Sequence, residues 1–309
     1  MKVVYLFYLF VFPGLLFTAV LGLLVGWVDR KVSARFQFRV GPPLFQNFSD
    51  LFKLFTKETI LVREGVSWVF IAAPLVAVAM LGGVSALIGV PLVFGLSFGG
   101  DLIVVMYLFM LFSVVVFLGG ASTGNVYSSL GGSREIKLLM ADELAFILVC
   151  LVAVIKAGYV LRFDAILAYQ AEHGAVAGSV SGIIALVVGL LCIQAKIALP
   201  PFHIPDAETE VVGGPFMEYG GPLLAFWKLG HFMMYVIFPF FLILLFLGGF
   251  QLQGLGILWA VLKYLGIIVV MIIIKNTNPR LRIDTAVSFF WKVASPLAFL
   301  AVILAVLGV

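Results

Sequence analysis

The 309-residue sequence has few charged residues and almost no cysteine. Only 11% of its residues are charged and 63% are hydrophobic, whereas soluble domains have about 25% charged and about 45–50% apolar residues. The net charge of +4 is too small to indicate a nucleic-acid partner. Cys150 and Cys192 lie in apolar runs without a CxxC or Cys/His cluster, so the sequence offers no ligand set for a metal ion or an iron–sulfur cluster. The composition therefore indicates an integral membrane protein.

Long apolar runs predict the fold class. A helix needs about 20 apolar residues to cross the bilayer core, and strong β-barrel alternation is absent. The run from Val3 to Val28 is too long for the apolar core of a signal peptide, so we interpret it as a first span. We predict an all-α integral membrane protein, a single transmembrane domain over 1–309 with about eight transmembrane helices. The expected spans are 3–27, 67–90, 102–121, 140–161, 175–198, 218–246, 255–274 and 287–308.

The distribution of lysine and arginine predicts the orientation. Most of the basic residues follow the first, third, fifth and seventh spans. By the positive-inside rule these loops are cytoplasmic and both termini lie outside, in a multi-pass protein of the plasma membrane. Residues outside the spans are concentrated in two cytoplasmic stretches, about 29–66 and about 199–217.

The first stretch contains an amphipathic pattern. Apolar residues recur at three- and four-residue spacing over 44–58, with Asp50, Lys53 and Lys57 between them. This pattern predicts a cytoplasmic interfacial helix of about 15–18 residues after the first span. A simple membrane anchor is the alternative interpretation.

A cationic segment precedes this pattern. Arg35, Gln37 and Arg39 alternate with phenylalanines, and an extended segment would place them on one polar face. Cations beside a span can simply set the topology. The glutamine among them and the following Gly-Pro turn favour a docking surface or a pocket wall.

Acidic residues gather at the predicted fourth span. Ser133 is a candidate N-cap, with Glu135 in the first turn. Asp142 lies seven residues after Glu135, on the same helix face, and Glu143 is adjacent. An interfacial helix cap would explain these acids, but two neighbouring carboxylates in a span are costly unless they are hydrated, protonated or paired.

The second cytoplasmic stretch is acidic. Asp206, Glu208 and Glu210 are followed by Glu218 at the start of the sixth span. A solvated acidic loop is the ordinary interpretation. The apolar, glycine-containing context of Glu208 and Glu210 instead favours partly buried carboxylates of a proton or cation path.

The predicted sixth span contains two polar residues on one face. Lys228 and His231 are three residues apart, and we expect both to face the bundle interior because lipid exposure is costly. A hydrogen-bonded core position is an equally good interpretation for the histidine.

Two long motifs carry a family resemblance. The segment 29–42 with its following polar residues resembles the first cytoplasmic loop of subunit 1 of respiratory complex I, the bacterial H subunit. The segment 201–213, followed by Glu218 and Tyr219, resembles that family's loop between spans five and six. The resemblance covers essentially the whole chain, and eight spans with outward termini agree with it.

The chain departs from the quinone-using members at several positions. Pro43 replaces their asparagine, Lys196 and Leu199 replace an acid and an arginine, His203 replaces an aspartate, and Asp142 replaces a tyrosine before the family's span-four glutamate. The segment 131–135 instead resembles a Ser-Arg-Glu signature of membrane-bound [NiFe] hydrogenases. The departures favour the archaeal hydrogenase branch, including its sulfane-sulfur-reducing relatives.

The resemblance implies a membrane-anchoring connector subunit of a ferredoxin-dependent, complex I-like respiratory complex. Its partners would be iron–sulfur and hydrogenase-large-like peripheral subunits, antiporter-like membrane subunits and the lipid bilayer. Iron–sulfur clusters and a NiFe centre would lie on those partners, with no cofactor, metal or catalytic residue on this chain. The residues implied in arm docking or chamber lining are Arg30, Arg35, Gln37, Arg39, Asp50, Lys53 and Lys57. The residues implied in an ion path are Asp142, Glu143, Asp206, Glu208, Glu210, Glu218, Lys228 and His231.

Three alternatives remain from the sequence. The chain can be the quinone-site subunit of a true NADH- or F420H2-quinone oxidoreductase. It can be a stand-alone secondary ion transporter, although no internal repeat supports this. It can also be a passive anchor whose acids only solvate loops.

Overall fold

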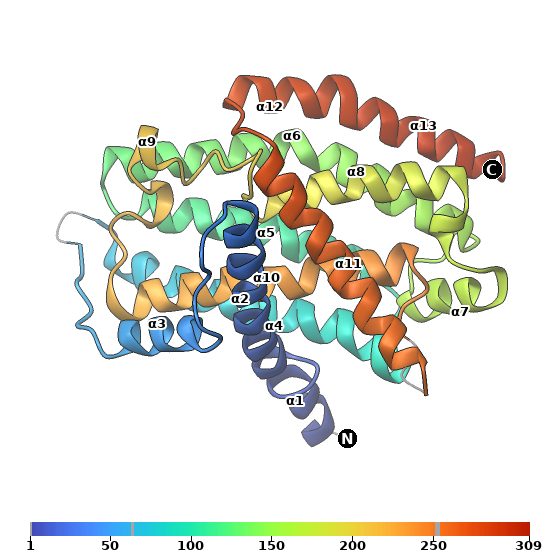
Figure 1. Ribbon diagram of the computed structural model, residues 1–309, viewed down its shortest axis with the longest axis horizontal. Coiled ribbons are helices and arrows are strands. Elements are labelled where there is room, and N and C mark those ends of the chain that lie inside the picture. Colours follow the sequence, from blue (N-terminus) through green and yellow to red (C-terminus); the bar gives the residue numbers. More distant parts are fainter. Residues whose placement is uncertain (1, 63–64, 251–253) are drawn as a thin grey trace.

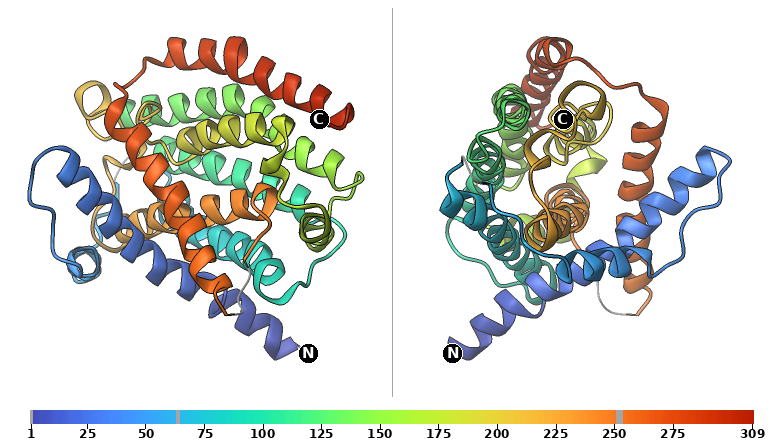
Figure 2. Two further views of the ribbon diagram at one scale, coloured as in Figure 1. Left: turned by 45° about the vertical axis from the view of Figure 1, so that its right-hand side comes forward. Right: turned by 90° about the vertical axis from the view of Figure 1, so that its left-hand side faces the viewer.

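The computed structural model describes residues 2–62, 65–250 and 254–309, without the side chains of Lys2, Val3, Glu208 and Thr209. In these segments the chain forms helices joined by loops and turns. Several helices run roughly parallel, while α2 and α11 cross them obliquely on one face (Figure 1). Helices α3 and α9 lie at one end of the bundle, hereafter the α3 end, and α7 lies at the other (Figures 1 and 2).

The helices follow the long apolar runs. Among the described residues, seven helical segments are long and apolar enough to span a membrane, the first counted from Val4 to Phe36 across α1 and α2. The apolar helix α8 has 17 residues and is shorter than the others, so the total of eight spans stays a prediction. The helices are α1 (Lys2–Phe10), α2 (Leu15–Phe36), α3 (Gln46–Phe55), α4 (Ser67–Phe94), α5 (Asp101–Ala121), α6 (Val126–Lys156), α7 (Phe163–His173), α8 (Val180–Lys196), α9 (Glu208–Val211), α10 (Gly221–Phe246), α11 (Gly256–Thr277), α12 (Ile283–Phe289) and α13 (Ser295–Val306). Short 3₁₀ turns η1 (Val176–Gly178) and η2 (Gly214–Phe216) and a π-helical turn η3 (Phe290–Ala294) complete the described elements.

Helix α10 forms the centre of the bundle. It packs against α2, α4, α8 and α11. Within the most apolar stretch of 18 residues of this helix, 78% of the residues are buried inside the protein. Gly22 of α2 allows a close crossing, because a Cβ there would lie 2.4 Å from the carbonyl oxygen of Phe232. The rings of Phe109, Phe146 and Phe241 form the aromatic core between α5, α6 and α10. The charged cavity described below lies away from this crowded centre, towards the α3 end.

The region after the first span differs from two predictions. Helix α3 has 10 residues instead of the expected 15–18, because the Pro42–Pro43 pair precedes it and a turn follows Phe55. Arg35 is still inside helix α2, and Gln37 is its C-cap. The expectation of an extended segment with Arg35, Gln37 and Arg39 on one face is therefore wrong.

The fourth long helix begins earlier than predicted. Helix α6 starts at Val126 rather than near residue 140, and Asn125 is its N-cap, accepting a hydrogen bond from the Tyr127 amide at 2.9 Å. Ser133 lies inside the helix, where its hydroxyl donates to the carbonyl of Leu130, so it is not the N-cap. With 31 residues, α6 is about 46 Å long, which exceeds the hydrocarbon core of a bilayer.

Candidate functional site

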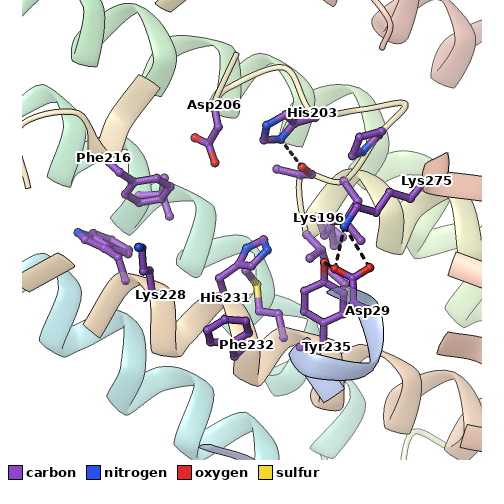
Figure 3. Close-up of a pocket in the computed structure, with 18 of the residues that line it drawn as sticks. Asp29, Lys196, His203, Asp206, Phe216, Lys228, His231, Phe232, Tyr235 and Lys275 are labelled. Carbon is purple, nitrogen blue, oxygen red and sulfur yellow. Dashed lines mark hydrogen bonds and ion pairs between the residues drawn. The ribbon is translucent and has the colours of Figure 1, made fainter. Parts of the chain in front are cut away.

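A cavity of about 530 Å³ lies at the α3 end of the bundle. Helices α2, α3, α5, α6, α10 and α11 and the chain after α8 all contribute to its wall (Figure 3). Charged and polar side chains are unusually frequent in this wall for a membrane bundle. These polar lining residues are Asp29, Arg30, Asn47, Asp50, Glu135, Lys196, His203, Asp206, Trp227, Lys228, His231, Tyr235 and Lys275.

One wall of the cavity is held by an ion pair between α2 and α11. The Lys275 ammonium lies 2.7 Å and 3.0 Å from the two carboxylate oxygens of Asp29 (Figure 3). Asp29 is only 6% exposed, and the Tyr235 hydroxyl donates a long hydrogen bond of 3.5 Å to it. Because both charges are compensated locally, this pair can fix the two crossing helices beside the cavity.

Helix α3 closes the cavity through polar contacts. The Arg30 guanidinium lies 3.3 Å from Asp50, and the side-chain amide of Gln46 donates to the same carboxylate at 2.8 Å. The buried Asn47 side chain donates to the carbonyl of Leu23 at 2.8 Å. Its oxygen has no hydrogen-bond partner among the described residues, so it remains available to a ligand or water in the cavity.

A buried lysine connects the cavity wall with two carboxylates of α6. The Lys196 ammonium lies 2.9 Å from Glu143 and 3.2 Å from Asp142. It also stands 4.6 Å from the centre of the Phe146 ring. The side chains of Lys196 and Asp142 are 4% and 1% exposed. Two carboxyl groups of α6 thus share one ammonium group inside the bundle.

Asp206 places a carboxyl group in the cavity wall from the loop between α8 and α9. Its Oδ1 atom is buried and has no hydrogen-bond partner among the described residues. Burial raises the pKa of this carboxyl group to about 7. His203, in the same loop, donates from Nδ1 to the carbonyl of Ala198 at 2.7 Å, which fixes the turn that carries the loop. Asp206 can therefore exchange a proton near neutral pH.

Lys228 and His231 of α10 both line the cavity, as their spacing predicts (Figure 3). Lys228 forms no ion pair with the part of the chain that the structure describes. The His231 ring lies 5.5 Å from the Tyr235 ring, centre to centre. The α10 wall therefore presents one uncompensated ammonium group to the cavity.

Four predicted path residues lie outside the cavity lining, namely Asp142 and Glu143, described above, and Glu210 and Glu218. Glu210 binds Arg134 of α6 at 2.5 Å and Arg280 at 3.0 Å, and the Arg134 hydrogen bond lowers the pKa of Glu210. Glu218 accepts a hydrogen bond of 2.6 Å from the Asn125 side chain. The Glu208 side chain lies outside the described part of the structure. The ion-path role of these residues stays a prediction.

The predicted docking residues divide into two groups. Arg30 and Asp50 line the cavity. The other members, Arg35, Gln37, Arg39, Lys53 and Lys57, are exposed at the α3 end. The four cations among them form no ion pair with any described residue, so they are available to an anionic partner.

The sequence did not identify several wall residues as site residues, namely Asp29, Asn47, Glu135, Lys196, Tyr235 and Lys275. The sequence pattern could have identified Glu135, because it lies seven residues before Asp142 on the same helix face. The side chains of both residues are buried. The described residues contain no group of three or more His, Cys, Asp or Glu side chains placed to hold a metal ion.

A family model and three relatives identify the family. A family model described as NADH dehydrogenase matches residues 8–306. The chain is 31% identical to the H subunit of the NADH-quinone oxidoreductase of Syntrophotalea carbinolica, covering 89% of this chain and 87% of that one. It is 34% identical to the H subunit of the Thermomicrobium roseum enzyme, covering 92% and 91%. It is 32% identical to subunit 8 of the Thermus thermophilus enzyme, covering 88% and 78%.

A solved structure has the same fold. A chain of the membrane-bound sulfane sulfur reductase, an archaeal respiratory membrane complex, superposes with a TM-score of 0.85 at 24% identity, covering 94% of this chain and 96% of that one. Matches to the family model and to subunits of respiratory complexes extend over nearly the whole length. The chain therefore belongs to the NADH dehydrogenase subunit 1 family, and it is a homologue of the H subunit in a complex I-like membrane complex.

Proposed function

We propose that this chain is the membrane connector of a ferredoxin-dependent hydrogenase or sulfane sulfur reductase complex. In this role it anchors an iron–sulfur peripheral arm on the cytoplasmic side and couples its electron transfer to proton or sodium translocation. The observation that carries the proposal is the position of Lys196, which lines the charged cavity and also binds Asp142 and Glu143 beyond it. A change of charge in the cavity can therefore act directly on the buried Asp142 and the half-buried Glu143.

The redox centres of such a complex would lie on its partners. The two cysteines are free and buried in the membrane bundle, which does not suit them as cluster ligands. Docking of the arm would use the exposed cations of the α3 end, and antiporter-like membrane subunits would receive the ion. The stand-alone transporter remains the alternative from another class, and ion transport by the isolated chain would favour it.

A quinone-site subunit is the second candidate. Its support is the cavity itself, whose volume of about 530 Å³ lies within the usual range of small-molecule sites. The buried Asn47 oxygen and Trp227 indole nitrogen in its wall lack hydrogen-bond partners among the described residues. Extraction of stoichiometric quinone from the native complex, without nickel or polysulfide-dependent turnover, would favour this candidate over the first.

The coupling role is tested with Glu143→Gln in the complete complex. The amide retains the shape of the side chain and removes its charge, so we expect normal assembly and normal electron transfer to a soluble acceptor. We expect ion uptake per electron, measured in proteoliposomes, to fall by about half or more. Glu172→Gln, at an exposed position of α7, is the matched control. An unchanged ratio in Glu143→Gln would show that this carboxylate is structural.

The docking role is tested by charge reversal of Arg35 and Arg39. Both side chains are exposed and lack an ion pair with any described residue, so the bundle does not need them for its own packing. We expect the double Glu variant to insert normally but to lose the peripheral arm, more completely at raised salt. Retention of a full arm on affinity-purified membranes would contradict the docking role.

A further inference from the structure

A second cavity, of about 450 Å³, opens on the side of the bundle. Residues of α2, α4, α10 and α11 line it, and its wall includes Phe17, Leu21, Leu24 and Val28 of α2. These four residues are half-buried, as expected for a groove that faces the surrounding membrane. Helix α11, which forms the other wall, lies obliquely across this face of the bundle (Figure 1). We refer to this space as the α2–α11 groove.

The polar atoms of the groove wall are already satisfied within the protein. The Trp27 indole nitrogen donates to the carbonyl of Pro42 at 3.0 Å, and the Tyr264 hydroxyl donates to the carbonyl of Tyr235 at 3.1 Å. The remaining lining is aliphatic, aromatic or glycine. A ligand that needs hydrogen bonds, such as a quinone head group or an ordered water, would find none here. Hydrocarbon is the occupant that this wall suits.

The apolar stripe of α2 continues into cations. Phe17, Leu21, Leu24 and Val28 follow one another at spacings of four, three and four residues, and Lys31 and Arg35 continue the same stripe. The Lys31 ammonium lies 3.5 Å from the carbonyl oxygen of Gly41, beside the loop whose Leu44 lines the groove. One face of one helix thus presents a hydrocarbon surface that ends in positive charge, which is complementary to a phospholipid with an anionic head group.

We propose that the α2–α11 groove is a binding site for an anionic phospholipid. One acyl chain lies in the groove, and the phosphate lies beside Lys31 at the α3 end. This site is separate from the charged cavity, and the proposal does not depend on the proposed function of the chain. A phospholipid bound in this groove should remain with the protein when the bulk membrane is removed, because several helices enclose its acyl chain.

The test is photo-crosslinking in the purified complete complex. A photoreactive p-azidophenylalanine replaces Leu24 in the groove or, as the matched control, Leu16, which is 55% exposed on the same helix and does not line the groove. The complex is extracted from vesicles of equal phosphatidylglycerol and phosphatidylcholine, exchanged into detergent and irradiated. Intact mass spectrometry then identifies the adduct. We expect phospholipid adducts at position 24 and detergent adducts at position 16.

The head-group part is tested with Lys31→Gln in the Leu24 photoreactive background. We expect about fivefold enrichment of phosphatidylglycerol over phosphatidylcholine with Lys31 and loss of most of this enrichment without it. Detergent or quinone as the adduct at position 24 would overturn the proposal. Equal amounts of phosphatidylglycerol and phosphatidylcholine adducts in the protein that retains Lys31 would show that the site does not select an anionic lipid. Cavity-filling Leu21→Trp, combined with the position-24 probe, should abolish the lipid adduct, and an unchanged adduct would place the lipid outside the groove.

Discussion

Two carboxylate–cation clusters lie along the same helix α6 but in different surroundings. Arg134 binds Glu210, whose side chain is 46% exposed, whereas Asp142 is 1% exposed and shares Lys196 with Glu143. Residues 134 and 142 are eight positions apart, which separates the two clusters by about 12 Å along α6. Solvent screens the charges of the outer cluster. This ion pair can therefore hold the 199–217 loop against α6, and its loss should cost little stability. The inner cluster is less exposed to solvent, so loss of its one cation would leave carboxylates uncompensated inside the bundle.

Removal of the inner cation should have the largest effect. Lys196→Met leaves Asp142 and Glu143 without their shared ammonium group, at a cost of about 3–5 kcal/mol for an uncompensated buried charge. We expect a large loss of assembled complex and a lower unfolding temperature in detergent, measured by differential scanning fluorimetry. Lys137→Met, at an exposed position of the same α6 helix, should have little effect.

The inner cluster also predicts a rescue. Lys196→Met combined with Asp142→Asn and Glu143→Gln removes all three charges, so most of the lost stability should return, although coupling should not. If the triple variant is as unstable as Lys196→Met, packing of the lysine stem rather than charge balance explains its importance.

Asp206 should give an intermediate effect that depends on pH. Its folded pKa of about 7 lies above its usual value of 3.8, so the folded protein binds this proton more tightly than the unfolded chain. The resulting stabilisation is complete below about pH 4 and is lost as pH rises towards 7. Infrared difference spectra should show a protonated carboxyl band that titrates near pH 7 and is absent in Asp206→Asn. A band that has disappeared by pH 5 would contradict the effect of burial.

Loss of the outer cluster should have the smallest effect. Glu210 has a lowered pKa because Arg134 donates a hydrogen bond to it, so its contribution is present above its usual pKa and is lost as pH falls through the lowered value. We expect Glu210→Gln to change the unfolding temperature by about 1 °C or less at physiological salt. Limited proteolysis of the 199–217 loop should be faster in the variant at low salt. A loss as large as that of Lys196→Met would remove the distinction between the two clusters.

Local sequence patterns predicted the apolar helices and the family, because hydrophobic length and contiguous motifs are properties of neighbouring residues. They did not predict where α6 begins. Its first turns pack on the η2 turn, and a Cβ on Gly131 would lie 2.6 Å from the Cα of Gly214. This contact joins segments that are far apart in the chain, so periodicity around residue 130 does not reveal it.

The candidate site was predicted only in part for the same reason. The spacing of Lys228 and His231 placed both on one helix face, and both line the cavity. Asp29 and Lys275 are separated by 246 residues, and each alone resembles an ordinary interfacial charge. Their importance depends on the crossing of α2 and α11, which no local pattern contains.

The Asp29–Lys275 pair also has a consequence for biosynthesis. Lys275 is added 246 residues after Asp29, which at about 5–20 residues per second takes about 12–50 s. Asp29 is therefore inserted with the first span while its partner has not yet been translated. During this interval the carboxyl group must stay hydrated or carry a proton, or be shielded by the insertion machinery. The first span reaches its final position only when α11 has been made, so the nascent bundle is completed by joining an early helix to a late one.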